Sequence, residues 1–158
     1  MKKGMTLIET SLYLALFGMA FLMIVQFGLS MREYQKLALV RTEIQKSLVI
    51  LNQEFLNSVS MSDSIDNISE FNTESGDLIL NESSGNVTYR VENFRLVKQD
   101  STSQIYLTPA DMVISQFIFT DIRSDDGDIL GIQINITLSY AKNNNVSESL
   151  SSTYAVYQ

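Results

Sequence analysis

The chain has 158 residues and a formal net charge of −7, and it contains no cysteine, histidine or tryptophan. Without Cys or His, thiol nucleophiles, Ser-His-Asp triads and the usual zinc sites are unavailable. An enzyme built only from carboxylates and lysines is the alternative that composition leaves open, but the sequence shows no constellation for it, and we expect no enzymatic activity. An acidic body also lacks the clustered Lys and Arg of a broad nucleic-acid-binding face.

The first element that the sequence predicts is a membrane-spanning helix over residues 5–31. Its length suits one crossing of a hydrocarbon layer of about 30 Å at 1.5 Å per residue. The apolar stretch is longer than the core of a secretory signal peptide, and no small-residue cleavage site follows it. The polar residues within it are Thr6, Glu9, Thr10, Ser11, Gln26 and Ser30.

The helix is predicted to continue through residues 32–59 as an amphipathic second half. No proline occurs before Pro109. Apolar residues recur at steps of three and four, and most charged residues lie elsewhere on the cylinder. The stripe consists of Leu37, Val40, Ile44, Leu48, Leu51, Phe55 and Val59. We therefore expect this half of the helix to pack against a globular domain.

Residues 60–75 are polar and predict a connecting loop, after which the apolar period changes to two. Residues 76–158 then predict a β-rich head of antiparallel strands. The strand candidates are "GDLILNE", "NVTYRV", "FRLVKQ", "QIYLT", "MVISQFIFTDI", "GIQINITLSY" and "STYAVY", and "KNNNVSES" is predicted to be a loop tip. A phase flip at Glu92-Asn93 indicates a hairpin or a bulge. The fold class is α+β, with the long N-terminal helix packed on a C-terminal antiparallel sheet.

Glu9 is the unusual residue of the span, because an ionised carboxylate deep in a bilayer costs about 2.5–3.5 kcal/mol. One alternative places Glu9 near the membrane face, where its side chain reaches water. The surrounding sequence, "KKGMTLIE", resembles the leader and cleavage site of type IV prepilins and pseudopilins. In that family a short basic leader ends in Gly, the cut precedes an apolar residue, and the fifth residue of the mature chain is Glu.

The resemblance implies a prepilin leader at residues 1–4, cleavage between Gly4 and Met5 by a prepilin peptidase, and N-methylation of Met5. It implies that Glu9 forms an assembly salt bridge with the N-terminal amine of a neighbouring pilin or pseudopilin subunit. A desolvated carboxylate is tolerated when a cation meets it. The implied location is the bacterial cytoplasmic (inner) membrane, crossed once, with the C-terminal domain extracytoplasmic, and later the filament or cell surface.

Two departures from many major pilins bear on the kind of subunit. Met5 stands where they have Phe, and "MIVQFGL" lacks their helix-breaking Pro. The C-terminal strand series resembles that of minor (J/PilW-like) subunits. The expected function is therefore a minor pilin or pseudopilin of a type IV pilus-like or type II secretion-like filament, helping to initiate assembly or form the tip. Such filaments serve secretion, motility, adhesion or competence. The alternative is a single-pass, membrane-tethered extracytoplasmic module that binds a ligand and forms no filament.

One segment, "DIRSDDGDILG", is a weak candidate for calcium through Asp125, Asp126 and Asp128. Calcium favours several carboxylate and carbonyl oxygens on a flexible loop. The spacing does not match the twelve-residue EF-hand loop, and no Glu closes it. A solvated hairpin tip is the favoured interpretation, and no other cofactor is expected.

Overall fold

The computed structural model describes residues 6–66, 68–83, 85–125 and 129–156. The chain divides into two compact units, one up to Leu39 and one from Val40 onward. A single helix, α1 (Leu7–Met61), belongs to both units, because its first part lies in one and its last part in the other. This confirms the predicted long N-terminal helix.

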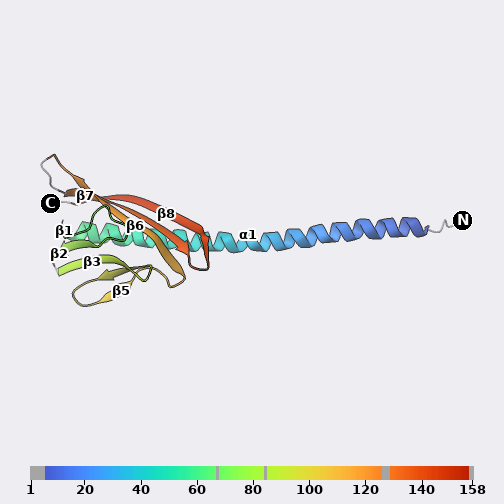
Figure 1. Ribbon diagram of the computed structural model, residues 1–158, viewed down its shortest axis with the longest axis horizontal. Coiled ribbons are helices and arrows are strands. Elements are labelled where there is room, and N and C mark those ends of the chain that lie inside the picture. The colour runs from blue at the N-terminus through green and yellow to red at the C-terminus, as the bar shows by residue number, and fades with distance from the viewer. Residues whose placement is uncertain (1–5, 67, 84, 126–128, 157–158) are drawn as a thin grey trace. The chain divides into compact units, whose positions relative to one another are not determined.

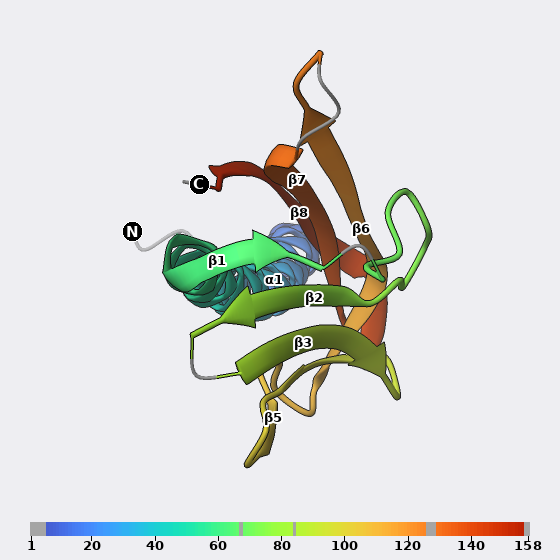
Figure 2. The same ribbon diagram turned by 90° about the vertical axis from the view of Figure 1, so that its left-hand side faces the viewer.

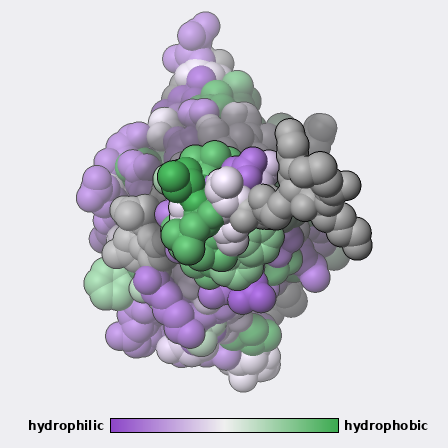
Figure 3. All heavy atoms as spheres, turned by 90° about the vertical axis from the view of Figure 1, so that its right-hand side faces the viewer, coloured by the Kyte–Doolittle hydropathy of each residue, from purple (hydrophilic) through white to green (hydrophobic). Residues whose placement is uncertain are grey.

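In the first unit, α1 exposes apolar side chains on all its sides. Leu7, Phe17 and Phe27 are 87%, 70% and 71% exposed, and no residue of the most apolar 18-residue window is buried. Figure 3 shows hydrophobic residues over most of the coloured surface around the start of this helix. By length and composition, the helix is apolar enough to cross a membrane.

The second unit combines the last part of α1 with two antiparallel sheets (Figure 1). The five-stranded sheet has the order β1-β2-β3-β4-β5, with β1 at Ser62–Ile65, β2 at Leu78–Glu82, β3 at Gly85–Glu92, β4 at Arg95–Gln99 and β5 at Gln104–Tyr106. The three-stranded sheet has the order β6-β7-β8, with β6 at Met112–Arg123, β7 at Ile129–Tyr140 and β8 at Asn143–Ala155. Within each sheet, strands that follow one another in the sequence are neighbours, as in simple antiparallel meanders.

The core of this unit lies between the helix and the two sheets, which flank α1 in Figure 2. The helix contributes Ile44, Leu48, Leu51, Phe55 and Val59, the predicted stripe without its first two members. At the centre, the Phe55 ring lies 5.0 Å from that of Tyr89 in β3, 6.2 Å from Phe117 in β6 and 6.4 Å from Tyr154 in β8. One helical side chain thus joins both sheets, and the α+β class is confirmed.

The structure differs from the predicted elements in three places. There are two sheets, not one. The segment 60–75 is not entirely loop, because α1 ends at Met61 and β1 then pairs with β2. The strand β8 begins at Asn143, so "KNNNVSES" is largely strand, and the turn before it lies at Ala141-Lys142. Both segments are rich in polar residues, which hides an alternation carried by only a few buried apolar side chains such as Ile65 and Val146.

The hairpin predicted near Glu92-Asn93 is present one residue later. Glu92 pairs with Arg95, and the two central residues Asn93 and Phe94 have φ angles of 52° and 60°. Two consecutive residues with positive φ define a type I′ turn, which matches the twist of the flanking strands.

Candidate functional site at the start of the helix

Of the three residues to which the resemblance assigns a role, the structure describes one. Gly4 and Met5 lie outside the described residues. Glu9 lies in the first turn of α1, three residues after Thr6. The flanking Leu7 and Ile8 are 87% and 79% exposed, so the acid stands among apolar side chains that have no cover within this unit.

Thr6 and Glu9 form a reciprocal pair of contacts at the helix start. The Thr6 backbone N–H donates to Glu9 Oε2 at 3.1 Å, and the Thr6 hydroxyl donates to the same oxygen at 3.2 Å. The Glu9 backbone N–H approaches Thr6 Oγ1 at 3.3 Å. This arrangement is the capping box, in which the N-cap residue and the third helical residue satisfy each other's free backbone N–H groups.

The capping box gives Glu9 a function within its own chain. Its carboxylate sits at the positive end of the helix dipole and accepts hydrogen bonds there, which lowers the cost of a charge in apolar surroundings. Both contacts from Thr6 reach the same oxygen, Oε2, and so orient the carboxylate. The sequence pattern Thr-x-x-Glu before an apolar run is the signal of a capping box, and an interpretation of Glu9 as an isolated charge misses it.

Comparison with protein-family models, with characterised proteins and with solved structures finds no match to this chain.

The candidate calcium segment is described only in part. Asp126 and Asp128 lie outside the described residues, and Asp125 is exposed in the turn after β6. The nearby Asp121 forms an ion pair with Arg123. Among the described residues, no group of three or more Asp, Glu, His or Cys side chains is arranged to hold a metal ion.

A polar cluster that sequence reasoning missed connects α1 to the five-stranded sheet. Lys98 Nζ in β4 lies 2.7 Å from Glu54 Oε1 in α1, and both side chains are about three-quarters buried, at 24% and 28% exposure. The Tyr89 hydroxyl lies 2.5 Å from Ser58 Oγ and donates to Glu54 Oε1 at 3.2 Å. Burial raises the pKa of Tyr89 well above 10. The hydrogen bond with Ser58 lowers this pKa in part, and the charge of Glu54 raises it further.

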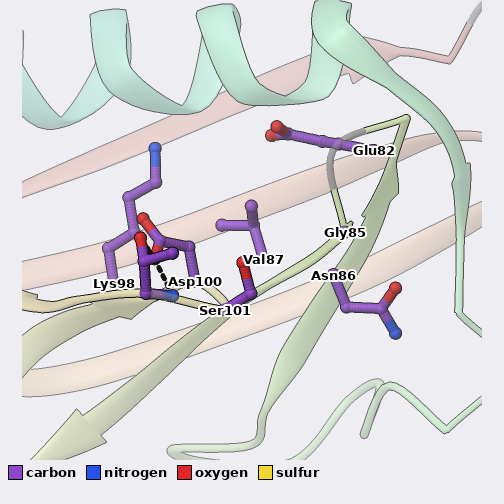
Figure 4. A pocket seen from close by; sticks show the side chains of 8 residues that line it. Glu82, Gly85, Asn86, Val87, Lys98, Asp100 and Ser101 are labelled. Carbon is purple, nitrogen blue, oxygen red and sulfur yellow. Dashed lines mark hydrogen bonds between the residues drawn. The ribbon is translucent and has the colours of Figure 1, made fainter.

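A shallow cleft of about 320 Å³ opens beside this cluster (Figure 4). Lys98 extends from its wall toward α1, and Glu82 reaches in from the end of β2. The Asp100 carboxylate accepts hydrogen bonds from Thr102 and Ser103, which hold its pKa well below the usual range. Lys98 and Asp100 of the cleft therefore already have partners within the chain. The polar cluster of Glu54, Ser58, Tyr89 and Lys98 joins the helix to the five-stranded sheet.

Proposed function

We propose that this chain is a minor pilin or pseudopilin, a subunit of a type IV pilus-like or type II secretion-like filament that helps to initiate assembly or form the tip. In this proposal α1 inserts in the inner membrane, a prepilin peptidase cuts between Gly4 and Met5, and Met5 is N-methylated. The head is then extracytoplasmic, and the apolar part of α1 passes from lipid to contacts with other subunits.

One observation carries the proposal: α1 is a single helix with two different surfaces. From Ile44 onward its apolar stripe is buried in the chain's own core, whereas up to Leu39 its apolar side chains are exposed on every side. Exposed apolar area of this extent requires lipid or other helices to cover it. A filament core and a bilayer both provide that cover, and a pilin subunit uses them in succession.

The capping box supports the proposed role of Glu9. It fixes a negative charge at the helix start, beside the position at which cleavage after Gly4 would create a new amine. Each subunit would carry both groups at its helix start, the amine of Met5 and the carboxylate of Glu9. Two neighbouring helices that are staggered along their axes would therefore bring the amine of one near the acid of the other. Pairing a buried carboxylate with a cation offsets much of the cost of its desolvation.

The decisive measurement is the mass of the mature N-terminus in cells that express a prepilin peptidase. We expect a chain that begins at N-methylated Met5. A bulky substitution at the cleavage site, Gly4→Leu, is expected to leave Met1 in place and abolish recovery in sheared filaments. An intact Met1 in the wild-type chain would refute the pilin proposal and leave the alternative of a membrane-tethered binding module that forms no filament.

A further inference from the structure

The strand β8 ends the three-stranded sheet and leaves a long edge open. Only β7 pairs with it among the described strands. The opposite edge of the same sheet is covered, because the carbonyls of Phe119 and Phe117 in β6 accept hydrogen bonds from the Asn72 and Ser75 backbone N–H groups, each at 2.9 Å. The chain thus protects one edge of this sheet with its own connecting segment, and the residues that the structure describes give the other edge no such cover.

The register shows which backbone groups the open edge presents. Val156 N–H donates to the Leu130 carbonyl at 2.9 Å, and the pairing then continues in steps from Ile132↔Tyr154 to Leu138↔Glu148. In an antiparallel ladder, hydrogen-bonded and non-hydrogen-bonded pairs alternate. The even-numbered residues of β8 therefore bond to β7. The odd-numbered residues point their N–H and C=O groups away from it, toward the open edge; these are Ser147, Ser149, Ser151, Thr153 and Ala155.

The features by which proteins usually block strand pairing are missing from this part of β8. Residues 146–155 contain no proline, lysine or arginine, and their register with β7 is unbroken from Ser147 to Ala155. The single charge, Glu148, pairs opposite the buried Leu138 and so shares the inner face. The outward side chains are small and neutral. An incoming strand meets neither a steric block nor a like charge on that face.

The flank of α1 beside this edge carries exposed apolar side chains. The Tyr154 hydroxyl in β8 donates to Asn52 Oδ1 at 2.7 Å, which places this flank against β8. Successive residues of an α-helix are rotated by about 100° around the helix axis. Leu56 and Val49 therefore lie roughly 40° and 60° around the axis from Asn52, in the direction away from the buried stripe. They are 46% and 67% exposed. A strand added to β8 would cover both.

We propose that the open edge of β8, together with Val49 and Leu56, binds an extended segment of a partner protein by β-strand addition. The segment has alternating side chains: apolar residues face the helix flank, and small neutral polar residues continue the Ser/Thr face of the sheet. Main-chain hydrogen bonds to the odd-numbered residues provide affinity, and the apolar positions provide specificity. The proposal extends beyond the proposed filament role and does not require it.

A second copy of this chain fits the edge less well than such a segment. Antiparallel pairing of two β8 strands keeps both helices on one side of the joined sheet but reverses one of them, and two chains anchored in one membrane share a helix direction. Parallel pairing keeps the direction but turns one sheet over. The Ser/Thr face of the second copy then meets Val49 and Leu56. A free segment has neither restriction.

The test uses the full chain in detergent micelles and a fluorescent synthetic peptide with the sequence of β7, residues 131–140, flanked by two lysines at each end. This peptide has the required alternation, and the same sequence pairs antiparallel with β8 along the opposite edge of that strand. A control peptide has the same composition with the alternation scrambled. We expect saturable binding of the β7 peptide by fluorescence anisotropy. Amide hydrogen exchange should slow at Ser147, Ser149, Ser151 and Thr153.

Two substitutions with matched controls locate the binding. Ser151→Pro removes an outward N–H without removing a hydrogen bond to β7 and is expected to weaken binding at least tenfold, whereas Ser151→Ala should leave it unchanged. Leu56→Lys should weaken binding similarly, whereas Ile50→Lys, on the opposite flank and 55% exposed, should not. Leu56→Lys changes an exposed helical residue, so this arm remains informative if Ser151→Pro disturbs folding.

Several outcomes would overturn the proposal. They are equal binding of the scrambled peptide, no binding up to the solubility limit of the β7 peptide, or binding that neither Ser151→Pro nor Leu56→Lys weakens. If the same amides become protected as the concentration of the chain alone is raised, the occupant is a second copy and the proposal is wrong. A failure here would leave the mass of the mature N-terminus unaffected, so the two proposals fail independently.

Discussion

Phe27 and Phe55 lie in the same helix, yet Phe27 is 71% exposed and Phe55 is completely buried. The apolar residues around Phe27 are exposed on every side of α1, whereas most of those around Phe55 form one buried stripe that faces two sheets. The difference shows that the spacing of apolar residues decides whether a helix is covered by its own chain or by its surroundings.

The largest expected effect concerns Glu9, the one acidic residue within residues 5–31. Replacing Glu9 by Leu removes both the capping contacts with Thr6 and the charge that we propose to pair with an amine. We expect incorporation into sheared filaments to fall at least tenfold while membrane insertion is unchanged, as measured by immunoblotting of membrane and filament fractions.

Glu9→Gln separates the two roles of this side chain. Gln also forms a capping box but carries no charge. If the charge matters for assembly, Glu9→Gln should assemble as poorly as Glu9→Leu. Normal assembly of Glu9→Gln would assign Glu9 to helix capping alone and remove the salt bridge from the proposal.

The next effect concerns the buried region. Phe55→Ala removes a ring that contacts Tyr89, Phe117 and Tyr154, and should lower the free energy of unfolding of the head by about 3–5 kcal/mol. Urea unfolding of the full chain in micelles, followed by near-ultraviolet circular dichroism, measures this. Phe27→Ala is the matched control and should leave the transition in place. Equal shifts for the two variants would mean that the head depends on the apolar half of α1.

Much of this contrast was predictable from the sequence. The stripe from Ile44 to Val59 has the helical period, and the pattern of Ile and Leu in β7 has the period of two, so the elements and their buried faces follow from local spacing. The choice of which strands pair with each other does not follow from local spacing. Lys98 and Glu54 are 44 positions apart and meet only because the five-stranded sheet sets the register against α1. The division into two sheets and the open edge of β8 depend on the same long-range pairing, for which spacing gives no signal.

A smaller effect tests the contact between Tyr89 and α1. Burial raises the pKa of Tyr89 above its ordinary value of 10, so its ionised form is disfavoured in the folded state. The corresponding stability is fully present below about pH 10 and is lost as the pH rises through the raised pKa. Tyr89→Phe should cost about 1 kcal/mol at pH 8, through the lost contacts with Ser58 and Glu54.

The pH dependence distinguishes Tyr89 from other groups that titrate in alkali. Tyr154, whose pKa is also raised by burial, is present in both proteins, so the difference between the wild-type and Tyr89→Phe curves reports on Tyr89. The free energy of unfolding, measured in urea from pH 8 to pH 11, should fall more steeply above pH 10 in the wild type. Parallel curves would show that Tyr89 does not titrate differently in the folded and unfolded chains.

The smallest effect, and the one of opposite sign, comes from a third phenylalanine. Phe94 is 69% exposed and occupies the second central position of the type I′ turn between β3 and β4, with a φ of 60°. A residue other than glycine in this conformation raises the free energy of the folded state by about 1–2 kcal/mol. Glycine stabilises the unfolded chain by about 0.4–1 kcal/mol, because it has more conformational entropy there. Because little apolar burial is lost, Phe94→Gly should stabilise the head by about 0.5 kcal/mol in the same urea titration. Phe94→Ala keeps the left-handed strain and should give no gain, so a gain of equal size with alanine would attribute the effect to removal of the exposed ring instead of to the turn.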